Sequence, residues 1–263
     1  MFSILLPVYN NQASLILALD SILEQIQSDD ELLVIDDAST DNSAYILSCY
    51  FSIHRPNISM RLITNPINIG LAASLNILIA LASKPYICRM DADDVAFPNR
   101  LDIQREMVQQ YPAVDIFGGA VIPFLSFSEF VNLQRYKDVS REPCLTIISS
   151  FSIAFRNKLA HPTTVIRRSI FSELLYNDFY EKAQDYKLWL DCAFRSYSFG
   201  IIQVPLLFYS AKSSSPTVKK QLMFALKARF SVLSISRPFF SLSLLLGMLY
   251  DLKNLLTIWF KPL

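Results

Sequence analysis

Five short apolar segments alternate with segments of helical periodicity in the first 119 residues, and this alternation constrains the fold more than any other feature. The expected strands are residues 2–6, 31–35, 60–64, 85–90 and 114–119. The segments between them place apolar side chains on one face, as in the helix expected after Ser14. Strands that alternate with helices of about ten to fifteen residues are typical of βαβ units. We therefore expect an α/β fold with a mostly parallel central sheet flanked by helices.

Four of these strands are each followed by a cluster of polar residues. The clusters are "PVYN" (7–10), "DDAST" (36–40), "NIG" (68–70) and "DADD" (91–94). In an open α/β sheet the ligand crevice lies outside the carboxyl ends of the strands. We therefore expect the four clusters to form one shared site.

The last of these clusters contains carboxylates suited to a cation. Asp91 and Asp93 are two residues apart at the end of an extended segment, so their side chains project to the same side. Mg²⁺ is usually held by one or two carboxylates with waters and substrate phosphates, and Mn²⁺ accepts the same oxygen ligands. Such a pair alone also occurs in turns after strands. The three neighbouring polar strand ends favour a site for Mg²⁺ or Mn²⁺.

Asp36 and Asp37 form a second carboxylate pair, for which two interpretations remain open. They cap the next helix with Ser39, Thr40 or Asp41, or they recognise donors such as a pyrimidine N–H or ribose hydroxyls. The sequence contains neither G-x-G-x-x-G nor a glycine-rich loop with a lysine, which excludes the usual dinucleotide-binding and P-loop sites. Phosphate would then be held through the metal.

The second half of the sequence is less regular. We expect residues 141–157 to be helical, 163–169 to form a strand and 184–197 to form an amphipathic helix. Residues 201–209 are a further expected strand, and Pro205 favours an edge position for it.

Two polar residues in this half have competing interpretations. A lone histidine such as His161 is more often a structural hydrogen-bonding residue than a catalytic one. Asp185, at the start of an expected helix, is either an acid favoured by the helix dipole or a general base directed into the crevice. Spacing alone does not decide between these.

Residues 217–263 form a basic tail on a slightly acidic body. The tail has seven Lys or Arg and one acid, Asp251, whereas the first 216 residues have 17 basic and 22 acidic side chains. The apolar run 239–250 is shorter than the roughly 20 residues that a spanning helix needs. We expect an amphipathic helix pair lying in a membrane interface. The alternative is that these helices pack on the domain or on another subunit.

The first tail helix is expected to be amphipathic, with a boundary before it at "KSSSPT" (212–217). Its expected apolar stripe is Leu222, Leu226, Phe230 and Leu233. The basic residues expected on its other faces are Lys219, Lys227 and Arg229.

The cysteines and the N-terminus indicate a cytoplasmic protein. Cys49, Cys88, Cys144 and Cys192 form no C-x-x-C pair, which argues against a zinc site and against a disulfide framework. We expect buried thiols in a reducing compartment. The N-terminus "MFSILLPVYNN" has no basic region before its apolar run, so we do not interpret it as a signal peptide.

Six motifs together carry a resemblance to a known family. In chain order they are "ILLPVYNN", "LLVIDDASTDNS", "NPINIGLAASLN", "YICRMDADDVAFPNRL", "HPTTVIRR" and "QDYKLWL", spread over residues 2–210. With these motifs the chain resembles the family 2 glycosyltransferases of the GT-A fold, of the type that builds bacterial surface polysaccharides.

The resemblance implies an inverting transferase that moves a sugar from a nucleotide diphosphate, usually UDP, to an acceptor hydroxyl. It places Asp91 and Asp93 as the metal pair for Mg²⁺ or Mn²⁺, with Asp93 the main ligand and Asp94 structural. It makes Asp185 the general base. The nucleotide-sugar pocket that it implies consists of Pro7, Val8, Tyr9, Asn10, Asp36, Asp37, Asn68, Gly70, Leu71 and Asp91.

Three departures from the family pattern concern residues around the phosphates and the base. Gln184 stands where the family often has Glu, although Asp185 is retained. Lys212 is the only cation near the position of a common arginine or histidine after the strand 201–209. Leu75 stands near the position of an arginine that is often found close to the "NIG" motif.

These features imply a division of the chain. Residues 1–211 form the GT-A domain, with a nucleotide-binding part at about 1–118 and an acceptor part at about 119–211, and residues 212–263 form the tail at the membrane surface. The expected partners are a nucleotide-diphosphate sugar, a saccharide or lipid-linked acceptor and the cytoplasmic face of the inner membrane, with no nucleic acid.

Three rival functions are weaker. An inactive nucleotide-sugar-binding relative would not need the retained Asp93 and Asp185. A metal-dependent phosphoryl or nucleotidyl transferase would need a glycine-rich basic loop, which the sequence lacks. A membrane-associated scaffold would leave the polar strand ends unexplained.

Overall fold

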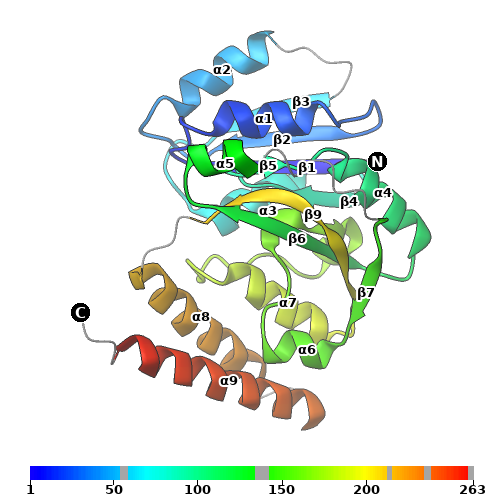
Figure 1. Cartoon of the computed structure of the whole chain (residues 1–263), viewed down its shortest axis with the longest axis vertical. Helices are drawn as coiled ribbons and strands as arrows, with labels where there is room; N and C mark the ends of the chain where they lie inside the picture. Colours follow the sequence, from blue (N-terminus) through cyan, green and yellow to red (C-terminus); the bar gives the residue numbers. More distant parts are fainter. Residues whose placement is uncertain (54–58, 134–141, 212–214, 234–237, 260–263) are drawn as a thin grey trace.

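The computed structural model describes residues 1–53, 59–133, 142–211, 215–233 and 238–259. Within these residues a nine-stranded sheet has the order β3-β2-β1-β4-β8-β6-β9-β5, and β7 also pairs with β9. Figure 1 shows α1 and α2 on one side of the sheet and α6, α7, α8 and α9 on the other. The α/β fold with a central sheet flanked by helices is therefore confirmed.

The bounds of the elements follow. The strands are β1 Phe2–Val8, β2 Glu31–Asp36, β3 Ser59–Thr64, β4 Tyr86–Arg89, β5 Val95–Ala96, β6 Ile116–Phe124, β7 Leu145–Ile148, β8 Val165–Arg167 and β9 Phe199–Ser210. The α-helices are α1 Leu15–Leu23, α2 Ser43–Ile53, α3 Leu71–Leu81, α4 Arg100–Gln110, α5 Phe127–Leu133, α6 Ser150–Phe155, α7 Gln184–Phe194, α8 Ser215–Leu233 and α9 Pro238–Trp259.

The first four strands of the sheet form its parallel part. β1 pairs in parallel with β2 and with β4, and β2 pairs in parallel with β3. Side chains of β1 are buried on both faces: Ile4 and Leu6 pack toward α1, and Leu5 packs in the core on the opposite face. A strand buried on both faces has a continuous apolar sequence, which is why it could be predicted.

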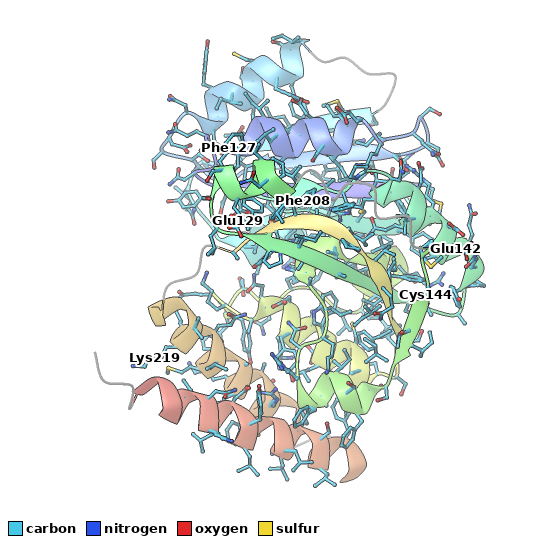
Figure 2. The ribbon with its side chains drawn as sticks, in the orientation of Figure 1. Phe127, Glu129, Glu142, Cys144, Phe208 and Lys219 are labelled. Carbon is cyan, nitrogen blue, oxygen red and sulfur yellow. The ribbon has the colours of Figure 1, made fainter. Side chains whose placement is uncertain are left out.

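Beyond β4 the sheet is mixed. β8 lies between β4 and β6 and is antiparallel to both, so the expected fifth strand does not extend the parallel run. β9 is parallel to β6 and antiparallel to β7 and β5. At the β5 end, Phe130 of α5 packs edge-to-face on Phe208 of β9, with ring centroids 5.4 Å apart. Figure 2 labels Phe208 on β9.

The prediction of one helix over residues 141–157 is wrong. Residue 141 lies outside the described residues, and Leu145–Ile148 form the strand β7 on β9. The three β-branched residues in "LTII" favour a strand. Helix α6 begins only after Ser149, whose side chain accepts a hydrogen bond from the Ser152 N–H at 3.2 Å.

Pro205 does not place β9 at an edge, which corrects the prediction from this residue. β7 pairs with residues 199–202 of β9 and β5 pairs with residues 207–208 on the same side. Pro205 lies between these two partners, opposite an irregularity in β6 at Ala120. The gap between the partners accommodates a residue that has no N–H to donate.

Helices α8 and α9 pack on α6 and α7 rather than extending away from the domain (Figure 1). Two predicted orientations on α8 are wrong, because Arg229 is buried and Phe230 is 59% exposed. Gly247 allows α9 to approach α6, since a Cβ at this position would lie 2.4 Å from the Phe155 carbonyl oxygen. Lys212, Arg237 and Lys261 lie outside the described residues, and the boundary at residue 212 stays a prediction.

The four cysteines are free thiols in the structure. Cys88 and Cys192 are buried as expected, whereas Cys144 is exposed next to β7 (Figure 2). Of the helices in the described part of the chain, none combines the length and the apolarity that crossing a membrane requires.

Candidate active site

A cleft of about 880 Å³ lies at the carboxyl ends of the parallel strands. All four predicted polar clusters contribute to its wall. The predicted site residues that line it are Pro7, Val8, Tyr9, Asp37, Asn68, Gly70, Leu71, Asp91 and Asp93. The polar strand ends thus meet in one place, as the strand order requires.

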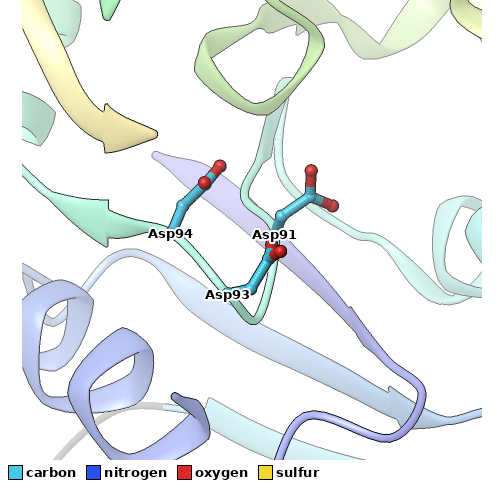
Figure 3. Close-up of side chains that lie close together, drawn as sticks. All are labelled: Asp91, Asp93 and Asp94. Atoms are coloured by element: carbon cyan, nitrogen blue, oxygen red, sulfur yellow. The ribbon is translucent and has the colours of Figure 1, made fainter. Parts of the chain in front are cut away.

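Three carboxylates lie close together at the turn after β4, and two of them, Asp91 and Asp93, line the cleft. Asp91, Asp93 and Asp94 project from the turn between β4 and β5 (Figure 3), and each offers an oxygen within 4.8 Å of the others. Carboxylate oxygens at this spacing fit a hard divalent cation such as Mg²⁺ or Mn²⁺. Among the described residues, the buried Oδ2 of Asp94 has no hydrogen-bond partner, which also fits a cation at this point.

Asp94 differs from its two neighbours because it is fully buried. Its Oδ1 accepts a hydrogen bond from the Ser210 N–H at 2.8 Å, which joins the acidic turn to the end of β9. Burial and the charges of Asp91 and Asp93 raise the pKa of Asp94 to about 8. The hydrogen bond to Ser210 agrees with the structural role that the family resemblance implies for Asp94.

Arg89, the last residue of β4, lies beside the acids, and the sequence analysis did not identify it. Its side chain is buried and forms an ion pair with Asp91. Burial alone would lower the pKa of Arg89, but Asp91 reverses this effect and raises it. Arg89 therefore orients Asp91. A charged residue inside the otherwise apolar segment "YICRM" is the signal that could have revealed it.

Arg100 and Gln104 of α4 join the acidic turn to the turn at His161–Thr163. The Arg100 guanidinium donates to the Arg89 carbonyl at 2.7 Å and to the Pro162 carbonyl at 2.8 Å. Gln104 donates to the Thr163 carbonyl at 2.7 Å. These bonds satisfy buried carbonyl groups at the point where β4 meets β8.

His161 is buried and has a structural environment. Its Nε2 lies 2.8 Å from the Tyr176 hydroxyl, and its ring packs edge-to-face against Trp189. Burial and then the charge of Arg89 lower the pKa of His161 well below its usual value. A neutral, hydrogen-bonded imidazole is the structural alternative that the sequence had favoured.

Asp37 shapes the loop that follows β3. Its carboxylate accepts hydrogen bonds from the N–H groups of Ile69 at 2.9 Å and Gly70 at 2.8 Å, and from the Asn65 amide at 2.8 Å. Gly70 precedes α3 and has a φ of 86°, a conformation that favours glycine. Asp37 therefore compensates the unpaired N–H groups at the start of α3, a contact that neither interpretation of the Asp36–Asp37 pair included.

Three predicted site residues within the described ranges do not line the cleft: Asn10, Asp36 and Asp185. The Asn10 side-chain oxygen accepts from the Thr40 N–H at 2.8 Å, and its N–H donates to the Ser39 hydroxyl at 3.0 Å. Asp36 is buried and accepts from the Ser39 N–H at 3.4 Å. Asn10 and Asp36 thus support the loop after β2 through hydrogen bonds and do not line the cleft.

Asp185 lies in the first turn of α7, directly after Gln184, which does line the cleft. Its carboxylate is half-buried and accepts a hydrogen bond from the Asn157 amide at 2.9 Å. Burial raises the pKa of Asp185, while the Tyr186 N–H, Asn157 and the charge of Arg89 act in the opposite direction. A raised pKa suits a group that takes up a proton. A carboxylate in the first turn of a helix also interacts favourably with the helix dipole, so the position of Asp185 is consistent with both interpretations.

The segment before α7 supplies part of the cleft wall that the sequence analysis missed. The residues from this segment are Asp178, Tyr180, Glu181 and Lys182, and Gln184 follows them as the first residue of α7. Glu181 also forms an ion pair with Lys220 of α8, so the C-terminal helices reach the rim of the cleft. Loops without periodicity carry little sequence signal, which explains the omission.

The positions where the family often has a cation near the phosphates offer none to the cleft among the described residues. Leu75 is fully buried in α3, so it offers no cation to the cleft. Lys212 lies outside the described residues. Among the described residues that line the cleft, Lys182 is the only cation, in a wall that otherwise carries several carboxylates. A diphosphate would meet net negative charge there unless a metal were bound.

Residues 3–175, more than half of the chain, match the family model described as "Glycosyl transferase family 2". The chain belongs to glycosyl transferase family 2. The match ends before Asp185 and before the C-terminal helices.

Relatives of this glycosyltransferase come from several organisms. An uncharacterized glycosyltransferase of Haemophilus influenzae is 28% identical over 191 residues, which are 71% of this chain and 58% of that protein. The Escherichia coli UDP-Glc:alpha-D-GlcNAc-diphosphoundecaprenol beta-1,3-glucosyltransferase WfgD is 34% identical over 106 residues, 40% of each chain. The glycosyltransferase thus spans about half the length of these two relatives.

A solved structure supports the fold. The mannosyltransferase PcManGT from Pyrobaculum calidifontis, in complex with GDP-Man and Mn²⁺, has a TM-score of 0.72 at 18% identity over 98% of this chain and 72% of that chain. At this identity the likeness concerns the fold alone, which is GT-A.

Proposed function

We propose that this glycosyltransferase is a metal-dependent, inverting hexosyltransferase. Its donor is a nucleotide-diphosphate sugar, a UDP-hexose or UDP-N-acetylhexosamine, and its acceptor is a hydroxyl of a saccharide or lipid-linked saccharide. The observation that carries the proposal is the cleft at the ends of β1, β2 and β4, with Asp91 and Asp93 in its wall, the buried Asp94 beside them and Asp185 next to the wall. The UDP-Glc donor and lipid-linked acceptor in the name of WfgD support the donor and acceptor classes.

The donor would lie across the carboxyl ends of the parallel strands. The segment Pro7–Tyr9 and the loop Asn68–Leu71, which Asp37 supports, form the walls against which a nucleotide can pack. Asp93 and Asp91 would hold Mg²⁺ or Mn²⁺, which supplies charge neutralisation for the leaving diphosphate. Arg89 keeps Asp91 oriented for this purpose.

Asp185 would act as the general base. Its carboxylate takes the proton of the acceptor hydroxyl as that oxygen attacks the anomeric carbon from the face opposite the leaving nucleotide. A general base is most effective when its pKa lies near the operating pH, and burial raises the pKa of Asp185 in that direction. Bacterial surface-polysaccharide assembly (lipopolysaccharide, O-antigen or capsule) is the process in which such a reaction fits.

Nucleotide release by the whole chain tests the proposal. We expect UDP release from at least one UDP-hexose or UDP-N-acetylhexosamine when Mn²⁺ and a diphosphoundecaprenol-linked saccharide are both present. GDP-sugars serve as the control donors. Binding of UDP without release, across a panel of lipid-linked and lipopolysaccharide acceptors, would favour an inactive relative. Absence of any nucleotide binding would contradict the proposed donor class.

We further propose that the exposed face of α9 places the enzyme on the cytoplasmic face of the inner membrane. Leucines on this face recur at helical spacing and are largely exposed: Leu242, Leu245, Leu246, Leu249 and Leu252. The basic Lys253 follows on the same side of the helix. Exposed leucines next to a basic residue suit the interface of an anionic bilayer.

Substitution of two of these leucines should reduce membrane binding. We expect Leu245→Ser with Leu249→Ser to lower co-sedimentation with phosphatidylglycerol vesicles severalfold, because each buried leucine contributes about 1.5–3 kcal/mol. The matched control is Leu125→Ser with Leu175→Ser, which are exposed leucines far from α9 in the sequence. Equal sedimentation of both double variants would indicate that the face of α9 does not bind lipid.

A further inference from the structure

The side chain of Asn157 has both of its polar ends engaged. Its amide group donates to Asp185 at 2.9 Å, and its carbonyl oxygen accepts from the Leu159 N–H at 3.1 Å. The bond from Leu159 determines which end of the amide is the oxygen, so the end that faces Asp185 is the donor. Asn157 therefore presents a hydrogen-bond donor to the carboxylate of the proposed base.

The C-terminal helix α8 contributes to the structure that carries Asn157. Asn157 follows the end of α6, where the last carbonyl groups of a helix lack intrahelical partners. The Arg229 guanidinium of α8 donates to the Phe155 carbonyl at 2.8 Å and to the Ala154 carbonyl at 3.2 Å. Tyr186 follows Asp185 in the sequence, and its hydroxyl also donates to the Ala154 carbonyl at 2.9 Å.

Arg229 is itself held by α9. Its guanidinium forms an ion pair with Asp251, and both side chains are nearly inaccessible, at 1% and 6% exposed. The absence of a side chain at Gly247 lets α9 lie against the Phe155 carbonyl and Arg229. Arg229 of α8 therefore connects α9, through Asp251, with the end of α6, through the two carbonyl groups. Because removing one partner of a buried ion pair is strongly destabilising, these contacts hold the three helices together.

A second cavity, of about 340 Å³, lies among these elements. Asn157, Ala183 and Tyr186 line it together with residues of α8 and α9. Gln184 belongs to the wall of the first cleft, so the turn that carries Asp185 separates the two spaces. The support for Asp185 therefore comes from the side away from the donor cleft.

We infer that Asn157 is a positioning residue for Asp185, and that α8 and α9 set its place through Arg229 and Asp251. This inference rests on the proposed function, because it assigns Asn157 a task in proton transfer. Asn157 keeps the carboxylate in one orientation and favours its ionised form. The other charged or titratable groups around Asp185 are Arg89 of β4, Tyr176 and Tyr186.

Two variants of Asn157 separate hydrogen bonding from packing. Asn157→Ala removes the side chain, whereas Asn157→Asp keeps its shape and the bond to Leu159 but replaces the donor with a like charge. In both variants the ionised Asp185 loses a donor, so its pKa should rise, more in Asn157→Asp. Asn254→Ala, on α9 and in the wall of the same cavity, is the matched control.

The measurement combines an NMR titration of the Asp185 carboxyl with steady-state kinetics of the full chain. We expect a higher Asp185 titration midpoint, an acid limb of the rate profile shifted to higher pH, and kcat reduced by up to about 100-fold with donor KM within about twofold. An unchanged midpoint in both Asn157 variants, or a loss confined to donor KM, would overturn the inference.

The contribution of the C-terminal helices is tested with Arg229→Lys. This variant keeps a cation for Asp251 but cannot donate to both α6 carbonyls in the geometry of a guanidinium. We expect a smaller shift in the same direction as for Asn157→Ala, with Arg195→Lys on the exposed pair with Glu173 as control. If Arg229→Lys and Arg195→Lys had the same Asp185 titration midpoint and the same kinetics, α8 would have no part in positioning Asn157. A wild type without transfer activity would refute the proposed function, while the NMR titration would still decide whether Asn157 acts on Asp185.

Discussion

Asp185→Asn should reduce the rate of sugar transfer by about two to four orders of magnitude while the nucleotide still binds. The variant keeps the shape of the side chain and its hydrogen bond with Asn157, but it cannot take up the proton of the acceptor hydroxyl. Nucleotide binding should persist because Asp185 does not contribute to the wall of the donor cleft. Nucleotide release measures the first effect, and calorimetric titration with UDP measures the second.

The pH dependence of the wild type should report the same carboxylate. The base must be ionised, so the rate should fall as the pH is lowered through the pKa of Asp185. Burial raises this pKa, which places the acid limb at a higher pH than an ordinary aspartate would give. Asp185→Asn should lack the limb that belongs to this group in its residual activity, because no carboxyl remains at position 185 to titrate.

A control on the same helix separates loss of the base from loss of structure. Asp191 lies in α7 and forms a partly buried i,i+4 ion pair with Lys187 at 2.5 Å, and neither residue lines the cleft. Asp191→Asn should therefore keep its transfer rate within about twofold, since i,i+4 pairs on a helix contribute only a few tenths of a kcal/mol. Wild-type activity in Asp185→Asn would show that Asp185 only stabilises the start of α7.

The parallel part of the fold and the location of the cleft were predictable for a physical reason. Strands buried on both faces must be apolar, and polar residues directly after them have to lie at one edge of the sheet. Asp37, Asn68 and Asp91 are distant in the sequence but follow parallel strands, so they were predicted to share one site, and all three line the cleft. The structural role of Asp94 stays a prediction, and its burial and its hydrogen bond from Ser210 distinguish it from Asp91 and Asp93.

The remaining features depend on contacts between distant segments. The position of β8 between β4 and β6 requires an antiparallel return from more than 70 residues away, which local periodicity does not encode. Periodicity likewise cannot distinguish a buried arginine from an exposed one, so Arg229 was assigned to the wrong face. The sequence signal that could have revealed the buried arginine is Asp251, the single acid of the basic tail, because a buried charge needs a partner.

Removal of the divalent cation should have the second large effect. We expect chelation with EDTA to lower transfer by about two to three orders of magnitude, equivalent to several kcal/mol of lost charge stabilisation at the diphosphate. Activity should return with Mn²⁺ or Mg²⁺. Asp93→Asn should reproduce the loss at saturating metal, because it removes a charged oxygen ligand from the group of three carboxylates.

The comparison of Asp93→Asn with Asp94→Asn makes this prediction specific. An asparagine at position 94 can still accept the hydrogen bond from the Ser210 N–H, so Asp94→Asn should have a much smaller effect on transfer. Calorimetry of UDP binding with and without Mn²⁺ provides a readout independent of turnover: the metal should tighten binding to the wild type and to Asp94→Asn but not to Asp93→Asn. If both variants responded alike, the cation would depend on the acidic turn as a whole rather than on Asp93. If chelation changed neither binding nor rate, the diphosphate would have to be neutralised by the protein alone, and Lys182 and Arg89 would be the side chains to test for that role.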